Sequence, residues 1–513
     1  MTARTMFASS LVGIVAVAAA PLCAQTDPEF TAPTPGESLD VREVTLDNGM
    51  RVLILPRAGA PTVSFVMQFA VGGVHERLGT TGVAHLLEHM LFKGSETIGT
   101  TDPVAERRLF ARADSIHDRL LRERAESIRS GMDSDRARRI GEWERELSAL
   151  EDSARAYVTS NEFDRILTRA GAQGLNATTT SESTSYFVEL PANRAELFFA
   201  LEADRMANPV FREFYTERDV VLEERGMRVE SSPGGALYEA HLAAAYSVHP
   251  YGVPVVGYRS DLETLGRDDV ARYYRSYYGP NNAVLAVVGR FDPIEVEGWV
   301  HRYFGHLPRG AEPPAVLAIE PEQRGERRVE LRWDAEPLLR IGWHVPEAIH
   351  PDAPPLAVLS AVLTGGRTSR LHRRLVTDER IATSVFSSMG PGELYPRLFQ
   401  VDAAPVFPAA PDDLETAIYE EIERLAAEGP TLEEVERVRN QISAGAVRRL
   451  QSNFGLALQL ANSASLFGDW RATFRSTERL KAVTPGDVRR VAERYLTETN
   501  RTVAVLIPEE ARQ

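Results

Sequence analysis

Two histidines and a glutamate within one short segment form the strongest chemical signal in the chain. Residues 85–89 read His-Leu-Leu-Glu-His. On a helix with about 3.6 residues per turn, His85 and His89 lie one turn apart on the same face, and Glu88 projects beside them. Two imidazoles suit a zinc ion, and a neighbouring carboxylate can take a proton from water activated by that ion. The segment therefore predicts a zinc site with a general base.

A second acidic segment is the candidate source of a third ligand. A zinc ion of this kind takes three protein ligands and keeps a fourth position open. Residues 217–224 read Glu-Arg-Asp-Val-Val-Leu-Glu-Glu. On a helix Glu217 and Glu224 share one face two turns apart, and the apolar residues between them can bury the helix. Acidic residues on helices are usually solvated, so only the histidines make this segment a candidate.

Length and composition indicate a soluble protein with at least two domains. The 513 residues exceed what one ordinary core holds. A hydrophobic share of 43% and a charged share of 26% are typical of globular proteins. The formal net charge of -15 argues against binding to nucleic acid or to anionic lipid surfaces. Beyond the N-terminus, no segment is apolar enough for an integral membrane span.

Residues 1–24 are predicted to be a secretory signal peptide. An apolar run over residues 6–20 is too short for a membrane span, and Leu-Cys-Ala follows as a cleavage site after Ala24. The only cysteine of the chain, Cys23, would leave with this segment. A lipoprotein site at Cys23 is disfavoured because proline and leucine precede it. Secretion points to the periplasm, and the proline-rich residues 25–40 are expected to form a flexible extension.

Pattern changes along the chain predict two domains. The first is expected over residues 41–304 and begins with two strands joined by an Asp-Asn-Gly turn. Residues 305–327 contain several prolines and are expected to be a linker. The second domain, residues 328–513, repeats the outline of strands, a helix and a glycine pair, which indicates a weak internal duplication. It has no H-x-x-E-H segment, so one zinc ion is expected per chain.

A charged insertion with helical periodicity interrupts the first domain at about residues 104–158. Its apolar residues recur at spacings of three and four, as in a seam between packed helices. They are Ile140, Trp143, Leu147, Leu150, Ala154 and Val158. Gly-Met-Asp-Ser at residues 131–134 breaks the pattern, which predicts a helical hairpin. The hairpin could act as a docking arm or a gate, but its charge pattern favours a solvated decoration.

Several stretches together resemble the pitrilysin/insulinase family of zinc metallopeptidases, which includes the mitochondrial processing peptidases. The family's signature has the order H-x-x-E-H, the inverse of the commoner H-E-x-x-H motif. The matching stretches follow the family's order: residues 82–94, residues 175–178 with Thr184 and Tyr186, then 217–224, 249–252 and 277–283. The resemblance covers the first domain strongly and the second weakly, through residues 363–371.

The resemblance implies a role for each candidate residue. His85, His89 and Glu224 correspond to the three zinc ligands. Glu88 corresponds to the general base, and Glu217 to a supporting acid on the helix of the third ligand. The resemblance also implies an α+β fold of two homologous α/β-sandwich domains in tandem, with the predicted hairpin inserted in the first.

Glu223 is the rival for the third ligand. It lies about 100° around the helix from Glu224 and away from Glu217, which favours Glu224. The separation of His89 from Glu224 exceeds that of simpler family members. The insertion over about residues 104–158 accounts for the excess.

Asn176, Ala177 and Thr178 are expected to contact substrate. They precede residues 186–190, whose alternating pattern predicts a strand. In the family such a strand lies at a sheet edge beside the zinc ion, and an extended peptide pairs with it through main-chain hydrogen bonds. In the alternative interpretation Asn176 only satisfies a turn, as asparagine often does.

These expectations combine into a periplasmic zinc metalloendopeptidase that hydrolyses peptides or unfolded polypeptides. Family members of this length pair two chains, so a homodimer, or a heterodimer with a related active or inactive chain, is expected. The alternatives are a non-catalytic scaffold or partner subunit of the same fold, and a protein that sequesters peptides without cleaving them. Inactive relatives usually lack the histidines or the glutamate, and this chain retains all of them, which favours catalysis.

Overall fold

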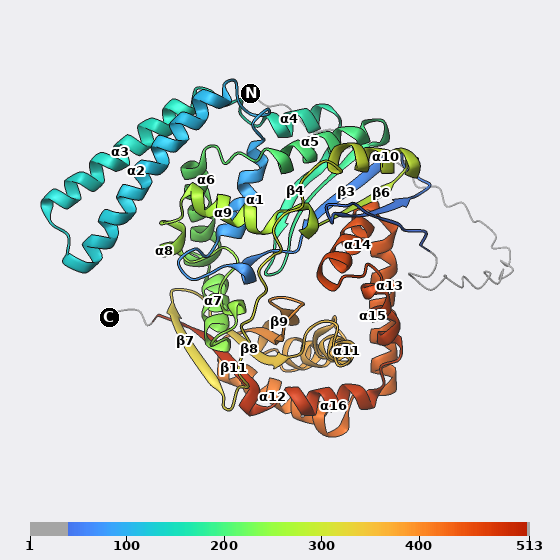
Figure 1. Ribbon diagram of the computed structural model, residues 1–513. Helices are drawn as coiled ribbons and strands as arrows, with labels where there is room; N and C mark the ends of the chain where they lie inside the picture. Colours follow the sequence, from blue (N-terminus) through green and yellow to red (C-terminus); the bar gives the residue numbers. More distant parts are fainter. Residues whose placement is uncertain (1–38, 510–513) are drawn as a thin grey trace, which may run out of the picture.

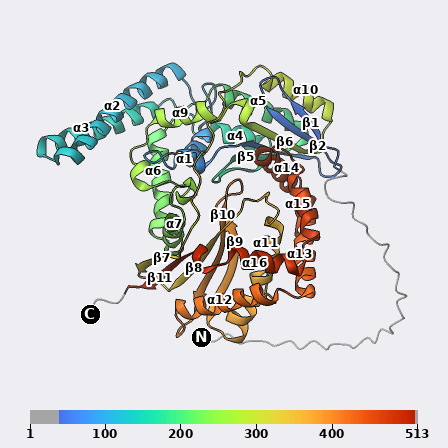
Figure 2. The same ribbon diagram turned by 60° about the horizontal axis from the view of Figure 1, so that its bottom comes forward.

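Two β-sheets organise the chain into two domains, one below the other in Figure 1. The computed structural model describes residues 39–509. The expected signal peptide over residues 1–24 and nearly all of the expected extension over residues 25–40 lie outside the described residues. The predicted α+β fold of two tandem domains is confirmed, since each domain packs helices against one sheet (Figures 1 and 2).

The first domain is built on a six-stranded sheet with the order β1-β2-β6-β3-β5-β4. Its strands are β1 (Arg42–Thr45), β2 (Arg51–Pro56), β3 (Thr62–Phe69), β4 (Gln173–Thr179), β5 (Thr184–Pro191) and β6 (Ala283–Gly289). The Asp-Asn-Gly turn joins the antiparallel pair β1 and β2, and β6 runs parallel to β2. Residues of β3 alternate between the two faces, so that Phe65 and Met67 enter the main core while Val66 faces the other way.

Helices cover one face of this sheet and bury its alternating apolar residues. They are α1 (Val83–Met90), α4 (Glu162–Arg169), α5 (Ala195–Ala207), α6 (Phe214–Arg225), α8 (Arg259–Leu262), α9 (Arg267–Tyr277) and α10 (Pro293–Phe304). Apolar residues of all these helices belong to the same buried core as those of β3 and β5. The core therefore positions α1 and α6, whose polar faces carry the candidate residues.

A helical hairpin, α2 (Pro103–Ser130) and α3 (Ser134–Arg155), projects from one side of the first domain (Figure 1). Asp102 and Asp133 accept backbone hydrogen bonds at the N-termini of the two helices. The predicted apolar seam is buried at Leu147, Leu150 and Ala154. Packing between the two helices therefore stabilises the hairpin along part of its length.

The second domain repeats the topology of the first on a five-stranded sheet with the order β7-β11-β8-β10-β9. Its strands are β7 (Arg327–Trp333), β8 (Leu338–Val345), β9 (Ala382–Gly390), β10 (Arg397–Pro405) and β11 (Arg501–Pro508). In this sheet β7 and β11 are parallel, and every other neighbouring pair is antiparallel. The first sheet has the same pattern over β2-β6-β3-β5-β4, where only β2 and β6 are parallel. α11 (Ala353–Thr364) follows β8 as α1 follows β3, so it takes the place of the histidine helix without any histidine.

The remaining helices of the second domain pack beside its sheet. They are α12 (Pro411–Glu428), α13 (Leu432–Gln451), α15 (Ala472–Lys481) and α16 (Pro485–Tyr495). Residues 308–326 connect the two domains without helix or strand. Among the helices within residues 39–509, none combines the length and the apolar composition that crossing a membrane requires.

Each sheet has its second face covered by a helix from the other domain. α14 (Asn453–Phe467) packs against the first sheet, where Leu456 and Leu460 share a buried cluster with Val66. α7 (Pro233–Ala245) packs against the second sheet, where Leu237 shares a buried cluster with Leu506. Figure 2 shows α14 beside β6 and α7 beside β7 and β8. Burial of both helices holds the two domains in a fixed relation.

Candidate metal centre

α1 presents its polar residues on one side because its other side is buried. Leu86 and Leu87 have no exposed surface and belong to the core. The helix begins after Gly82, whose φ of 86° favours glycine. The carboxylate of Glu76 accepts hydrogen bonds from the backbone N–H groups of Gly82 and Ala84, each at 2.8 Å. This cap anchors the first turn and so sets the direction in which the next residues point.

Three candidate ligand atoms converge from α1 and α6. Nε2 of His89 lies 3.4 Å from Oε2 of Glu224, and Nε2 of His85 lies 3.6 Å from the same oxygen. Within the described part of the chain, these side chains form the one group of metal-ligand types whose atoms all lie within 4.8 Å of one another. Glu223, the rival for the third position, is exposed and does not belong to the group.

The separations and the chemistry of the group fit a zinc ion. In a tetrahedral site with metal–ligand bonds of about 2.0–2.1 Å, the ligand atoms lie about 3.4 Å apart. The observed 3.4 and 3.6 Å agree with that spacing. Burial lowers the pKa of His85 to about 3, so the imidazole is neutral near pH 7 and offers a lone pair. Two imidazoles with one carboxylate are a known donor set for catalytic zinc.

Glu88 lies between the two histidines and the edge of the first sheet. It is 9% exposed, and Oγ1 of Thr179 in β4 donates a hydrogen bond of 2.5 Å to its Oε2. Burial raises the pKa of the Glu88 carboxyl. A carboxylate with a raised pKa is a stronger base than an exposed one, which suits the transfer of a proton.

Glu217 supports His89 from the second helix. Its Oε2 lies 3.6 Å from Nδ1 of His89, and its Oε1 lies 2.5 Å from Nζ of Lys93. Although burial opposes ionisation, hydrogen bonds from His89 and Lys93 hold the pKa of Glu217 below its usual value. A carboxylate on the second nitrogen of a ligand histidine fixes the orientation of the ring. By contrast, Nδ1 of His85 is buried without a hydrogen-bond partner among residues 39–509.

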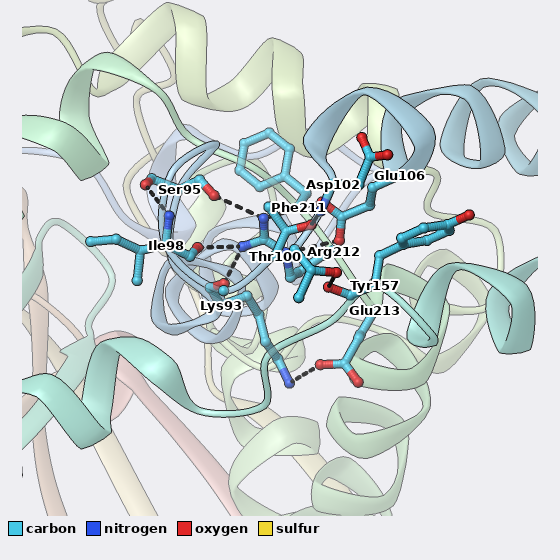
Figure 3. Close-up of polar contacts among 12 residues, drawn as sticks. Lys93, Ser95, Ile98, Thr100, Asp102, Glu106, Tyr157, Phe211, Arg212 and Glu213 are labelled. Carbon is cyan, nitrogen blue, oxygen red and sulfur yellow. Dashed lines mark hydrogen bonds and ion pairs between the residues drawn. The ribbon is translucent and has the colours of Figure 1, made fainter.

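Arg212 joins the loop after α1 to the first turn of α2 (Figure 3). Its guanidinium is 1% exposed and pairs at 3.0 Å with Glu106, which is equally buried. It also donates hydrogen bonds to the carbonyl oxygens of Lys93, Ser95 and Ile98. Since the Lys93 side chain reaches α6, Arg212 holds together the segments that set the spacing between α1 and α6.

The base of the hairpin packs against α6. Tyr215 of α6 donates a hydrogen bond of 3.4 Å to Asp114 of α2. Arg267, the first residue of α9, lies 2.5 Å from the same Asp114 and 3.7 Å from Glu151 of α3. Thr216 of α6 donates a hydrogen bond of 3.3 Å to Glu151. These contacts brace the helix that carries the two candidate glutamates, so the base of the hairpin has a structural part in the site.

The edge strand of the first sheet beside the candidate metal centre is β4. The expectation that the alternating segment, residues 186–190, forms this edge was wrong. Residues 186–190 lie in β5, which pairs with both β3 and β4. The alternation marks β5 because one of its faces is buried, whereas β4 is largely exposed and lacks such a pattern. β4 carries Asn176, Ala177 and Thr178 and ends at the residue that contacts Glu88. Of the three, Ala177 is buried in the core.

Four polar residues that support the site were not predicted from the sequence. They are Glu76, Lys93, Thr179 and Arg212. Lys93 lies within the matched stretch around the histidines, which was the only signal for it. Each of the others acts through a contact that only the folded chain creates.

Replacing Arg212 by methionine is expected to destabilise the protein strongly. The Arg212→Met variant leaves the carboxylate of Glu106 buried without its partner, which costs about 3–5 kcal/mol of unfolding free energy. Arg107→Met is the matched control, because Arg107 lies beside Glu106 on α2, is 54% exposed and pairs with Glu96 at the surface. The control should lose less than about 1 kcal/mol. Denaturant unfolding followed by circular dichroism measures both, and equal losses would contradict the central position of Arg212.

Comparison with known proteins gives matches over both domains. The family model described as insulinase (peptidase family M16) matches residues 51–106 and 153–258, and so leaves most of the hairpin unmatched. The model described as peptidase M16 inactive domain matches residues 264–442.

Individual relatives extend over almost the whole chain. The zinc protease PqqE of Helicobacter pylori is 27% identical over 478 residues, which cover 91% of this chain and 92% of that protein. The crystal structure of a protease from Helicobacter pylori has a TM-score of 0.76 at 24% identity, covering 92% of this chain and 100% of that one. The periplasmic protease PqqL from Escherichia coli has a TM-score of 0.66 at 16% identity, covering 92% of this chain and 48% of that one. The predicted resemblance is thus confirmed, and the chain belongs to the insulinase family, peptidase family M16.

Proposed function

We propose that the protein is a secreted zinc metalloendopeptidase that cleaves peptides or unfolded polypeptides. The observation that carries this proposal is the convergence of His85, His89 and Glu224 at ligand spacing, with Glu88 beside them. A relative of similar length is named a zinc protease, which supports the same chemistry. One zinc ion per chain follows from the single group of this kind among the described residues.

Each side chain of the candidate centre has a separate role in the proposed reaction. His85, His89 and Glu224 would hold the zinc ion, which supplies Lewis acidity that acidifies water and polarises a peptide carbonyl. The carboxylate of Glu88 accepts the proton of the attacking water and returns it to the leaving amine. Because Thr179 donates to Oε2 of Glu88, Oε1 is the oxygen left to take the proton.

Glu217 acts as a positioning residue. Its contact with Nδ1 of His89 directs the other ring nitrogen towards the ligand group, and Lys93 holds the carboxylate in place. It touches no reacting atom in this scheme, so its effect passes through the orientation of His89.

The substrate binds as an additional strand along β4. The outer side of this strand has no pairing partner among the described strands, and its last residue contacts Glu88. Backbone groups of Asn176, Ala177 and Thr178 would pair with an extended peptide, and the buried Ala177 would contribute only its backbone. Main-chain pairing accepts many sequences, which suits a peptidase acting on unfolded chains.

A non-catalytic scaffold or partner subunit is the second candidate function. The match of the second domain to the family model described as inactive favours it for that half of the chain. The first domain, however, retains every residue that the chemistry requires. Cleavage of a quenched fluorescent peptide that a chelator abolishes would separate an enzyme from a scaffold and from a protein that only sequesters peptides.

Export and pairing of chains are part of the proposal, as expected from residues 1–24 and from the family. A structural neighbour described as a periplasmic protease supports the location. Protein recovered from the periplasmic fraction is expected to begin at Gln25, and sedimentation is expected to give twice the mass of the chain. Retention in the cytoplasm with an intact N-terminus would contradict export, and a fully active monomer would contradict pairing.

Loss of any one ligand is expected to remove the metal. His85→Ala, His89→Ala and Glu224→Ala each leave two protein ligands, too few to retain zinc through dialysis. Elemental analysis should give about one zinc per chain for the wild type and for the control His306→Ala, whose imidazole is exposed. Zinc lost from Glu223→Ala and kept by Glu224→Ala would move the third ligand to Glu223.

Neutralising the proposed base is expected to stop the reaction and leave the metal bound. Glu88→Gln keeps the shape of the side chain but accepts no proton, so kcat should fall by about 10²- to 10⁴-fold. The matched control is Glu223→Gln, which changes an exposed carboxylate on α6 and should keep wild-type turnover. Both are assayed with a quenched fluorescent peptide alongside zinc analysis. Wild-type turnover by zinc-loaded Glu88→Gln would refute the assignment.

A further inference from the structure

A cavity lies behind β4, the edge strand of the first sheet, and is lined by residues of both domains. Its volume is about 760 Å³, and Thr178 and Ser185 of the first sheet line one wall. Residues of α11, α14, α15, β9 and β10, together with the loops beside them, form most of the remaining lining. Thr179 contacts Glu88, whereas its neighbour Thr178 faces the cavity. Because successive side chains of a strand point to opposite faces, β4 separates the cavity from the candidate metal centre.

Arg397 is a buried cation in the wall of this cavity. The residue is 9% exposed, and its one hydrogen bond, from Nη1 to the carbonyl oxygen of Gly392, is long at 3.4 Å. Its Nε is buried without a partner, and no carboxylate of residues 39–509 lies within ion-pair distance of it. A buried guanidinium left without an anion is destabilising, because burial removes water that would otherwise solvate its charge. The wall therefore holds a cation with unused donors.

Among residues 39–509, no acidic side chain forms a direct ion pair with this cation. Glu393 and Glu182 both act on Arg397 from beyond ion-pair distance, and burial raises the pKa of the Glu393 carboxyl. Asp469 is held by Arg475 at 2.5 Å. Arg479 lines the cavity as well and is exposed. Arg397 therefore keeps a donor atom that an incoming anion can engage.

The wall that carries Arg397 is held in place by the first domain. Glu182 is 2% exposed and accepts hydrogen bonds from the backbone N–H groups of Glu393 at 2.8 Å and Leu394 at 2.7 Å. The hydroxyl of Tyr251 donates to the same carboxylate. A wall fixed across the domain boundary is preorganised to receive a ligand.

We propose that the cavity is a substrate subsite in which Arg397 binds a carboxylate-bearing side chain of the peptide. A peptide paired with β4 directs every second side chain to the face of the sheet on which Thr178 lies. The peptide residue directly opposite Thr178 then has its Cβ about 4.5–5.5 Å from the Cβ of Thr178. Those side chains enter the cavity, and an aspartate or glutamate among them supplies the anion that Arg397 lacks. The inference rests on the proposed function, since it takes the peptide from the same edge strand.

Binding of matched peptides to the zinc-loaded Glu88→Gln protein tests the subsite without cleavage. The probes are two series of labelled peptides that are otherwise uncharged. In one series a single glutamate is placed at each position in turn, and in the other a glutamine takes its place. Fluorescence anisotropy should show about tenfold tighter binding of glutamate at one position, or at positions two residues apart. Adding Arg397→Met should bring the two peptides to equal affinity, and Arg397→Lys should restore part of the preference.

The matched control is Arg340→Met, which removes a partly buried arginine of the same sheet, one that pairs with Asp402. It should leave the preference for glutamate unchanged. The ratio of the two affinities within one preparation does not depend on the fraction of folded protein, so a loss of stability cannot imitate the result. A preference that is absent, that survives Arg397→Met, or that Arg340→Met also abolishes would overturn the subsite.

Cleavage by the wild type separates this inference from the proposed function. If the wild type cleaves peptides and no preference for glutamate depends on Arg397, the subsite fails and the peptidase stands. If the wild type cleaves none of the peptides but glutamate binds through Arg397, the peptidase fails and the anion site stands.

Discussion

Everything proposed for this protein depends on holding two helices from distant parts of the chain at one separation. Metal bonds of about 2.0–2.1 Å tolerate errors of only a few tenths of an ångström in the atoms that form them. Apolar packing sets the distance between α1 and α6, but it has little directional preference. The hydrogen bonds of Glu76 and Arg212 supply that direction, because each joins a side chain to backbone atoms at fixed positions. The centre is thus supported by residues that never touch the ligand group.

The two domains have the same topology but different tasks. α1 carries the reactive residues, while α11 occupies the equivalent place with an apolar sequence and no titratable side chain. The second domain instead contributes α14, which covers the open face of the first sheet, and the wall that contains Arg397. In return α7 covers the second sheet. This exchange makes each domain part of the other's core, so the cavity between them keeps its shape.

The edge strand explains how one sheet can serve chemistry on one face and selection on the other. Thr179 points to Glu88 and Thr178 to the cavity, and the side chain of Ala177 is buried in the core. The side chains of a peptide paired with this strand would alternate between the same two faces. The hairpin of α2 and α3 braces α6 at its base, and so contributes to the geometry of the centre even though most of its surface is charged and solvated.

The sequence by itself determined the family, the fold class and the residues of the candidate centre. Short motifs carry such information because His85, Glu88 and His89 are neighbours on one helix, and because Glu217 and Glu224 repeat at a helical spacing. The sequence also predicted the strand β5, because a strand with one buried face alternates between apolar and polar residues.

Only the tertiary structure decided which strand is the edge, which buried charges hold the helices, and which surfaces of the two domains face each other. β4 shows no periodic pattern because neither of its faces is fully buried, so local sequence could not distinguish it from a loop. Arg212 and Arg397 belong to no motif, and the residues around each of them in the sequence do not distinguish it from the other arginines of the chain. Their roles arise from burial and from partners far away in the chain, and burial is a property that the whole fold creates.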